Sequence, residues 1–270
     1  MPELPEVETV RQTLLRLVKD EIIEDVDCFV ERIIKMDIQA FKKRLIGQRI
    51  HTIDRIGKHL MFMLDTDVLI IHLRMEGRFY LKDKADLINK HEHVVFHLSH
   101  GHILTYHDVR KFGTMHLVDK ANYKHEYPIN CVGLEPWDID PRAFYETIKT
   151  RKLEIKALLL DQHLISGLGN IYVDETLFLS NIHPMRPGTS LSVFDVEKII
   201  SSARFVLHEA IKQGGTTIRT FEAMDGVHGR FQNILNVHTK KGQPCQVCGT
   251  TIIKMKVKGR GTYVCPTCQK

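Results

Sequence analysis

Long apolar runs are missing from this chain of 270 residues, and no segment approaches the roughly 20 apolar residues of a transmembrane helix. The sequence also shows no targeting segment, no low-complexity tract and no internal repeat, which argues against secreted, fibrous and solenoid classes. Only six cysteines occur, and without a signal peptide we expect them in a reducing compartment. We therefore expect a cytoplasmic protein without membrane segments, and its length fits two domains.

Four of the six cysteines form two pairs, Cys245-x-x-Cys248 and Cys265-x-x-Cys268, separated by sixteen residues. This spacing is typical of a four-cysteine zinc ribbon, and residues 251–263 alternate enough apolar residues to form a hairpin. Two disulfides are the alternative, which is disfavoured because Cys28 and Cys131 lie far away in apolar sequence. We predict one structural Zn²⁺ held by all four thiolates, with no open coordination position for catalysis.

Positive charge is concentrated in the last fifth of the chain. The net charge is +5, but residues 219–270 carry nine Lys or Arg against two acidic residues, so residues 1–218 total about −2. A basic tail of this kind predicts a polyanionic partner. Arg260 lies between Gly259 and Gly261, where we expect a tight turn at the hairpin tip that lets the guanidinium reach a phosphate. A solvated hairpin with ordinary surface lysines is the alternative.

The chain opens with Met1-Pro2-Glu3-Leu4-Pro5-Glu6. Removal of Met1 would leave a secondary amine at Pro2, which can attack a sugar carbon and form a permanently cationic iminium. The following residues predict an amphipathic helix with Pro5 in its first turn and an apolar face formed by Val7, Val10, Leu14 and Leu17. The positive end of that helix lowers the pKa of a nearby amine and increases its nucleophilic fraction at neutral pH. An ordinary helix start is the alternative.

Two regions of different composition lie between these ends. Residues 22–118 contain short β-type runs, among them 67–73, 92–98 and 113–118, at the spacing of an all-β sandwich. Residues 141–213 are helical in pattern, most clearly 195–213, with Ser192 as the expected N-cap and Gly214-Gly215 as the expected stop. Residues 128–140 are the expected connection.

A glycine-rich segment, Ser166-Gly-Leu-Gly-Asn170, opens one of the expected helices. Backbone N–H groups at such a helix start make an anion site, and the amide of Asn170 would add a donor. A simple tight turn between packed helices is the alternative. With a basic hairpin in the same chain, the turn is interpreted as a second phosphate contact.

Six motifs then match a known family in order: Pro2–Thr9, Gly57–Leu60, His72–Met75, Asp108–Gly113, Gly167–Glu175 and Lys258–Gly261. The chain resembles the formamidopyrimidine-DNA glycosylases, bacterial repair enzymes that excise 8-oxoguanine and ring-opened purines and then cleave the abasic strand. The resemblance implies an α+β multi-domain protein with DNA bound between its domains. We expect an N-terminal helix with a β-sandwich catalytic domain at 1–130, a linker at 131–140, a helix-two-turns-helix domain with a lesion loop at 141–235, and a zinc finger at 236–270.

The resemblance also implies residue roles. Pro2 is the nucleophile, and Glu3 is the acid and proton shuttle. Lys58, Asn170 and Arg260 are implied to contact the phosphates around the lesion, and Lys58 and Arg260 count with Pro2 and Glu3 as catalytic residues. His91 is a further implied DNA-binding residue. The gap left by the flipped-out base is filled by Met75, Arg110 and Phe112. From composition alone, Lys58 would be a surface lysine and Met75 a core methionine.

The family chemistry needs no nucleotide cofactor, because iminium formation at the sugar acidifies the adjacent carbon and permits β,δ-elimination of both phosphates. The implied partner is double-stranded DNA that contains oxidised bases or abasic sites. We expect a bacterial, nucleoid-associated monomer.

Two departures from the family pattern concern the second half of the chain. His238 occupies a position where this family usually has a phosphate-contacting tyrosine. The lesion-covering loop is expected within residues 215–230, where Thr216–Arg219 is typical of the family and 223–229 is variable.

Two alternative functions share some of these features. An endonuclease VIII-type enzyme for oxidised pyrimidines would keep the proline, the glutamate and the zinc finger, but the filling residues of that branch lie elsewhere than Arg110 and Phe112. A non-catalytic zinc-ribbon DNA-binding protein would not need Pro2 and Glu3.

Overall fold

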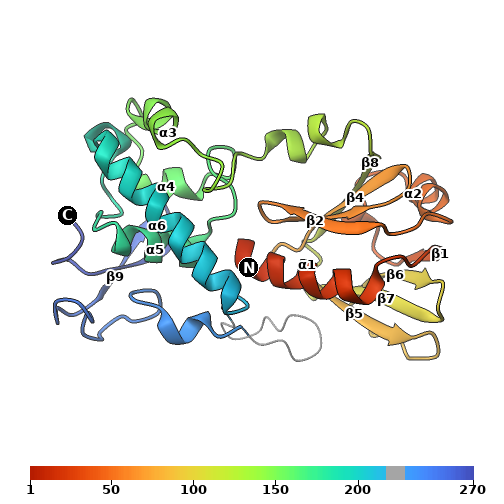
Figure 1. Cartoon of the computed structure of the whole chain (residues 1–270). Helices are drawn as coiled ribbons and strands as arrows, with labels where there is room; N and C mark the ends of the chain where they lie inside the picture. Colours follow the sequence, from red (N-terminus) through yellow and green to blue (C-terminus); the bar gives the residue numbers. More distant parts are fainter. Residues whose placement is uncertain (217–228) are drawn as a thin grey trace. The chain divides into compact units, whose positions relative to one another are not determined.

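The computed structural model describes residues 1–216 and 229–270. The chain divides into two compact units, the first formed by Met1–Cys131 with Gly214–Gly229 and the second by Val132–Gln213 with Arg230–Lys270. The first unit holds the helix α1 and two β-sheets, and the second holds most of the helices and a small hairpin (Figure 1). Within the described ranges no helix combines the length and the hydropathy of a membrane span.

Helix α1 (Leu4–Val18) begins where the sequence predicts. Pro5 lies in the first turn, where its missing N–H costs no hydrogen bond, and Glu3 and Glu6 form a capping box. The helix buries Leu4, Val7, Val10, Leu14 and Val18. The prediction for Leu17 is wrong: this side chain is 38% exposed, because Val18, four residues after Leu14, takes the inward position.

Two antiparallel four-stranded sheets form the body of the first unit. One sheet has the order β1-β6-β7-β5, with strands Ile23–Cys28, Glu92–Leu98, His102–His107 and Arg78–Asp83. The other has the order β2-β3-β4-β8, with strands Thr52–Ile56, His59–Met63, Asp67–His72 and Thr114–Asp119. Connecting segments add helix α2 (Ile38–Leu45) and the 3₁₀ turns η1 (Glu31–Ile33), η2 (Tyr123–His125) and η3 (Ile129–Cys131).

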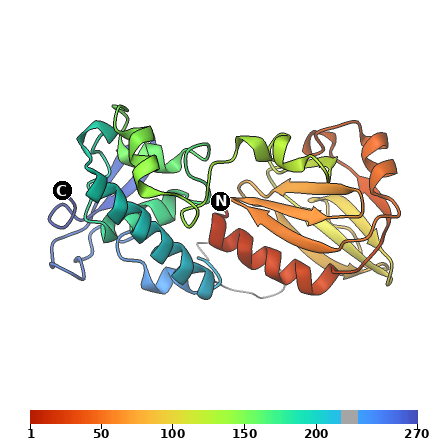
Figure 2. The same ribbon diagram turned by 45° about the horizontal axis from the view of Figure 1, so that its top comes forward.

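One apolar core joins α1 to both sheets. It contains Val10 and Leu14 of α1, Phe62 of β3, and Phe96 and Tyr106 of the other sheet. Helix α1 lies along β2 and β3 (Figure 2). Full burial of each large apolar side chain contributes about 1.5–3 kcal/mol, so this shared core fixes the direction of α1 and with it the position of the residues that precede the helix.

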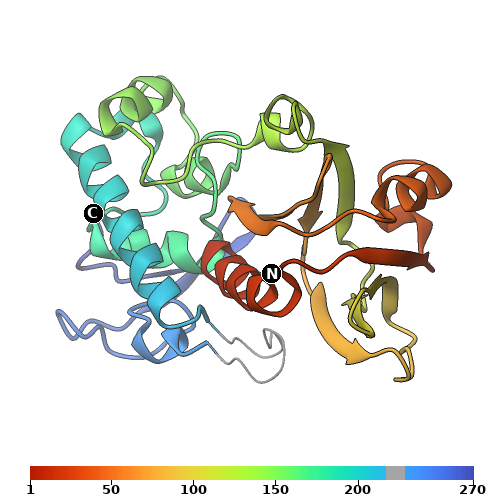
Figure 3. The ribbon, with the colours of Figure 1, turned by 45° about the vertical axis from the view of Figure 1, so that its right-hand side comes forward.

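The second unit contains the helices α3 (Pro141–Ile148), α4 (Ile155–Leu160), α5 (Asn170–Leu179) and α6 (Val193–Lys212). It also contains the 3₁₀ turns η4 (Gly188–Ser190) and η5 (Phe231–Ile234) and the hairpin of β9 (Ile253–Val257) and β10 (Arg260–Val264). Helix α6 packs against both α3 and α5 (Figure 3). The predicted N-cap of α6 is confirmed: Ser192 accepts from the N–H of Asp195, and the helix ends before Gly214 and Gly215, which both have positive φ.

Residues 132–140 are fixed to the second unit by hydrogen bonds. The N–H of Gly133 donates to the carbonyl of Gln162 (2.8 Å), and the guanidinium of Arg204 donates to the carbonyls of Pro136 and Ile139 (2.8 Å each). The expected linker is therefore ordered chain packed on α6 and the α4–α5 connection. The predicted α+β class, with an N-terminal β-sandwich and a helical second part carrying a hairpin, is confirmed. The boundaries of the four domains stay a prediction.

Candidate nucleophile, phosphate contacts and metal centre

Pro2 and Glu3 lie at the positive end of α1. Pro2 is buried, Glu3 is 3% exposed, and the preceding Met1 is 48% exposed. The N–H of Glu3 donates to Oε2 of Glu6 at 2.8 Å, which fixes the backbone at the helix start. The capping interactions of the helix thus hold Pro2, with its amine nitrogen, next to the carboxylate-bearing Glu3.

Glu6 is a site residue that the sequence patterns did not predict. Its Oε1 accepts from the N–H (2.7 Å) and the hydroxyl (3.0 Å) of Thr216, while its Oε2 accepts from Glu3. Gly215 has φ +81°, and a Cβ there would lie 2.7 Å from the same carboxylate. One buried carboxylate therefore joins the start of α1 to the start of the expected lesion loop. Residues 217–228 of that loop lie outside the described residues. The capping-box pattern, Glu at the third position after an N-cap, was the available signal.

Lys58 lies in a two-residue turn. Gly57 (φ +56°) and Lys58 join β2 to β3, whose last and first residues, Ile56 and His59, are paired. The residue is only 4% exposed, so it is not the surface lysine that composition alone would suggest. Lys58 is therefore a buried lysine at the turn between β2 and β3.

Two imidazoles lie near Lys58. The rings of His59 and His72 meet edge to face at 4.7 Å, and Nδ1 of His72 accepts from the N–H of Arg74 (2.9 Å). Burial, followed by the charges of Arg74 and Lys58, lowers the pKa of His59 to about 4. Burial, the His59 ring and Arg74 lower the pKa of His72 further. Neutral imidazoles beside two cations favour an anionic ligand.

Asp108 shapes the loop that carries Arg110 and Phe112. Its carboxylate is fully buried and accepts from the N–H groups of Arg110 (3.0 Å), Phe112 (2.8 Å) and Gly113 (2.8 Å). The side chains of Arg110 and Phe112 stay outside: Phe112 is 48% exposed, and the guanidinium lies 4.8 Å from the ring centre. The buried carboxylate of Asp108 thus holds the loop in a conformation in which the guanidinium of Arg110 and the ring of Phe112 are exposed.

Met75 and His91 also lie on the first unit. Met75 is 38% exposed and follows Arg74, which has positive φ, so the core-methionine alternative is wrong. The carbonyl of His91 accepts from the N–H of Asp108 (3.0 Å), which fixes His91 beside the Arg110 loop. The structure thereby brings His91 to the same segment as Arg110 and Phe112.

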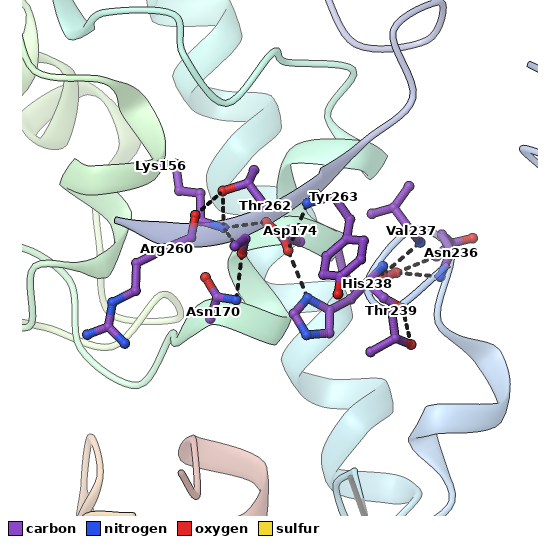
Figure 4. Close-up of polar contacts among 12 residues, drawn as sticks. Lys156, Asn170, Asp174, Asn236, Val237, His238, Thr239, Arg260, Thr262 and Tyr263 are labelled. Atoms are coloured by element: carbon purple, nitrogen blue, oxygen red, sulfur yellow. Dashed lines mark hydrogen bonds and ion pairs between the residues drawn. The ribbon is translucent and has the colours of Figure 1, made fainter. Parts of the chain in front are cut away.

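Asn170 is the first residue of α5. Its Nδ2 donates to the carbonyl of Gly261 at 2.9 Å, so one amide hydrogen ties the helix to the hairpin (Figure 4). Arg260 is exposed and lies at the start of β10, paired with Val257. The expected turn at Arg260 is wrong, because Lys258 (φ +45°) and Gly259 (φ +77°) make the two-residue turn.

A buried ion pair holds the hairpin against the helices. Nζ of Lys156 lies 2.7 Å from Oδ1 of Asp174, and both side chains have 0% exposure. The same Nζ donates to the hydroxyl of Thr262 (2.8 Å) and the carbonyl of Gly261 (3.3 Å), as Figure 4 shows. No local pattern predicts this pair, since Lys156 interrupts an apolar helical segment and would be expected to face solvent.

The four cysteines of the ribbon converge. The Sγ atoms of Cys245, Cys248, Cys265 and Cys268 all lie within 4.8 Å of one another. Tetrahedral Zn–S bonds place sulfur atoms ~3.8 Å apart, and the structure has 3.9 Å for Cys245–Cys268 and 3.4 Å for Cys248–Cys265. The donor set therefore fits one structural Zn²⁺, which would fix the hairpin and supply no reacting group.

The ribbon is anchored to the second unit. Phe178 of α5 and Val237 pack with Cys245, Ile252 and Cys265 in a small apolar cluster. The amide of Gln269 donates to the carbonyl of Ile182 (3.0 Å), and the N–H of Lys270 donates to the carbonyl of Asn181 (3.1 Å). Metal coordination and these contacts together place Arg260 relative to α5.

Three family models match successive parts of the chain. They are the formamidopyrimidine-DNA glycosylase N-terminal domain at residues 1–115, the H2TH domain of the same enzymes at 132–222, and the zinc finger found in FPG and IleRS at 242–270. The matches follow the order of the sandwich, the helices and the cysteine ribbon.

Proteins similar to the chain are full-length matches. The formamidopyrimidine-DNA glycosylases of Bacillus cereus and Geobacillus kaustophilus are 48% and 46% identical to it, over 100% of this chain and 99% and 100% of theirs. Among solved structures, an FPG mutant of Lactococcus lactis in complex with a Fapy-dG containing DNA is 39% identical with a TM-score of 0.94, and MutM in complex with carbocyclic 8-oxo-G containing DNA is 39% identical with a TM-score of 0.92. Both structures match over 100% of each chain.

The neutral state of His72 makes stability sensitive to acid. In the unfolded chain an imidazole titrates near ~6.5, whereas burial lowers the pKa in the folded chain. The unfolded state then binds more protons below pH 6.5, so this contribution is complete above 6.5 and is lost as the pH falls, at about 1.4 kcal/mol per pH unit. We expect urea titrations at pH 7 and pH 5 to show a larger loss for the parent than for His72→Asn. A His125→Gln control should lose as much as the parent; equal losses for His72→Asn and the parent would contradict a neutral His72.

Loss of the metal is expected to weaken contacts with duplex DNA without a direct effect on the chemistry. Cys248→Ser removes one of four sulfur ligands, so the hairpin should loosen and displace Arg260, and affinity for plain duplex should fall about tenfold or more. Metal analysis should give one zinc per chain for the parent and for Cys131→Ser, a matched cysteine outside the ribbon. Full DNA affinity after chelation, or a metal-free parent, would show that the ribbon does not act in this way.

Proposed function

This chain belongs to the formamidopyrimidine-DNA glycosylases, and from that membership we propose how it removes oxidised purines such as 8-oxoguanine and formamidopyrimidines from duplex DNA and then cleaves the abasic strand. The observation that carries the proposal is the placement of Pro2 and Glu3 at the capped, positive end of α1. The lesion types are those present in the DNA of the similar solved complexes.

The first step is nucleophilic. After removal of Met1, the nitrogen of Pro2 forms a bond to the sugar C1′, and the bond from C1′ to the base breaks with its electron pair on the base. The amine loses its N–H proton to the carboxylate of Glu3, the adjacent residue, which delivers this proton to the ring oxygen of the sugar as the ring opens. The departing base takes up a proton from water. The product is a cationic iminium between Pro2 and C1′, which has no N–H to lose.

Strand cleavage follows from the iminium. The cation withdraws electrons from C2′, so a proton acceptor removes a C2′ proton and the 3′ phosphate leaves with the C–O electron pair. A second elimination releases the 5′ phosphate. Hydrolysis then frees Pro2 and returns the enzyme, so the reaction consumes only water. The zinc site takes no part in these steps.

Cationic and amide donors position the strand. Lys58 is proposed to contact the phosphates around the lesion, and its burial supports this because a fixed lysine charge loses less entropy on binding an anion. Arg260 and Asn170 are proposed as phosphate contacts of the second unit, with His91 as a further contact from the first.

Exposed side chains of the first unit are proposed to replace the flipped-out base. Met75 and Phe112 are large, apolar and exposed, so their side chains are available to contact a partner. Insertion into the duplex would offset a few kcal/mol of unstacking. Arg110 is proposed to face the orphaned base.

We place this activity in the bacterial cytoplasm, at the nucleoid, and in a monomer.

The nucleophile can be tested by covalent trapping. Pro2→Gly is expected to reduce borohydride trapping on an 8-oxoguanine duplex by about 100-fold or more, and retention of Met1 should abolish it, because the attack needs the free amine. Pro5→Gly, which changes the same residue type without altering the terminal amine, should still be trapped. Mass spectrometry is expected to place the adduct on Pro2; an adduct on a lysine with Pro2 unmodified would rule out the mechanism.

The base opposite the lesion tests the role of Arg110. A guanidinium only donates hydrogen bonds, so it matches the adjacent acceptors O2 and N3 of cytosine, whereas the amino group of adenine would face another donor. We expect 8-oxoguanine opposite C to be excised faster than opposite A, by roughly 1–3 kcal/mol of discrimination. Single-turnover rates on both duplexes should show this preference in the parent and in Arg142→Ala, an exposed arginine of α3, and its loss in Arg110→Ala. An unchanged C-to-A ratio in Arg110→Ala would assign the discrimination to another residue.

A further inference from the structure

Two loops of the first unit cross between its two sheets at the same place. The Met75 loop, residues 73–77, leads from β4 to β5, and the Arg110 loop, residues 108–113, leads from β7 to β8. Strand β4 pairs with β8 in one sheet, and β5 pairs with β7 in the other. Both loops therefore start and end on neighbouring strands. The first exposes Met75, and the second exposes Arg110 and Phe112.

Each loop is closed at its base by the backbone N–H of its last residue, a glycine. The N–H of Gly77 donates to the carbonyl of Leu73 (3.0 Å), and the N–H of Gly113 donates to Oδ2 of Asp108 (2.8 Å). Leu73 and Asp108 are both buried. The base of each loop is thus fixed in the fold, while the side chains between the closing residues reach the surface.

The hydroxyl of Tyr106 touches both glycines. This tyrosine of β7 is fully buried, and its ring packs on Phe79 with centroids 5.3 Å apart. A Cβ built on Gly77 would lie 2.3 Å from the phenol oxygen, and a Cβ built on Gly113 would lie 1.7 Å from it. Because a carbon–carbon bond is only ~1.5 Å long, the backbone of both glycines lies in contact with this one oxygen.

The same hydroxyl belongs to the hydrogen bonds of the Arg110 loop. It lies 3.5 Å from Oδ2 of Asp108, the oxygen that accepts from the N–H groups of Phe112 and Gly113. Burial, followed by the charge of Asp108, raises the pKa of Tyr106 well above its usual range, so the hydroxyl keeps its hydrogen and donates to the carboxylate. A phenylalanine would fill the core equally but would lack these contacts, so the oxygen is the group that connects the two loops.

We propose that Tyr106 is a positioning residue for the filling of the gap in the DNA: its hydroxyl holds the bases of the two loops together, so that Met75, Arg110 and Phe112 enter the duplex in one step. The inference rests on the proposed function, which takes these three side chains as the replacement for the flipped-out base. Since Tyr106 is fully buried, it acts through the loops and not on the DNA itself. Loops that are already joined lose less conformational entropy on insertion than two loops that must be ordered separately.

The test is a double-mutant cycle in two backgrounds. Met75→Ala and Phe112→Ala, singly and together, shorten exposed side chains and leave the core unchanged. If the loops enter together, loss of one side chain already disfavours insertion of the other, so the double variant should lose less affinity than the product of the single losses, by about fivefold. In Tyr106→Phe the loops move separately, and the losses should multiply. Tyr123→Phe, the same change in η2, is the matched control and should keep the coupling of the parent.

Affinity is measured by fluorescence anisotropy with two duplexes, one undamaged and one that contains a tetrahydrofuran abasic analogue opposite C, which the amine cannot process. Hydrogen exchange of the DNA-free protein, followed by mass spectrometry, adds a readout in which DNA takes no part. Exchange in both 73–77 and 109–113 should be about fivefold faster in Tyr106→Phe than in the parent and in Tyr123→Phe.

Thermal unfolding shows whether Tyr106→Phe keeps the fold, and the cycle in the parent needs no folded Tyr106→Phe. Losses that multiply in the parent, or coupling that persists in a folded Tyr106→Phe, would overturn the inference and leave the glycosylase proposal intact. Faster exchange in only one loop would also overturn it, because the hydroxyl would then support that loop alone. A parent that binds the abasic duplex no better than the undamaged duplex would contradict the proposed function, while hydrogen exchange would still decide whether Tyr106 joins the loops.

Discussion

The buried ion pair of Lys156 and Asp174 is the interaction on which the second unit depends. Lys156 joins α4 to the hairpin through Thr262 and Gly261, and Asp174 joins α5 to the hairpin through the N–H of Tyr263. Because both charges are removed from water, loss of one partner costs about 3–5 kcal/mol, far more than loss of a surface pair. The hairpin is small and has only a minor apolar cluster, so this pair and the cysteine ligands supply the rigidity that its own core cannot.

Three other buried carboxylates position loops in the same manner. Glu6 accepts from Glu3 and Thr216, Asp108 from three N–H groups of its own loop, and Glu175 from three successive N–H groups at 236–238. A carboxylate that accepts several backbone hydrogen bonds fixes a loop without covering its outer surface. The side chains of that loop remain available to a partner, which is why Arg110 and Phe112 are exposed although their backbone is tightly held.

The organisation of the proposed DNA contacts follows from this arrangement. Pro2 and Glu3 depend on the capping box of α1, and Arg260 depends on the two-residue turn before β10 and on the metal ligands. The carboxylate of Asp174, which pairs with Lys156, also holds the ring of His238. The chemistry of the terminal amine needs little catalytic machinery, and most of the structure therefore serves to hold a flexible polyanion at fixed donors.

The candidate site was predictable from sequence where its chemistry is local. The zinc ligands were predicted from two Cys-x-x-Cys pairs, because two cysteines that bind the same ion from one tight turn are separated by only two residues. The resemblance to the family predicted roles for Lys58, Met75, Arg110 and Phe112. Only the structure showed that these residues lie in turns and loops. The predicted turn was one residue too far along the chain, because the observed turn is Lys258-Gly259. Arg260 has a glycine on each side, and such a sequence fits more than one hairpin register.

The sequence by itself determined the elements and the family: helices α1 and α6 from apolar periodicity and caps, the strands from short β-type runs, and the ribbon from cysteine spacing. Only the tertiary structure decided which polar residues are buried together. Glu6 meets Thr216 across 210 residues and Lys156 meets Thr262 across 106. Local patterns record which face of an element is apolar, but a polar pair formed across the fold leaves no periodic mark in either segment. The partner of His238 therefore emerged only when α5 and the segment after η5 were seen packed together.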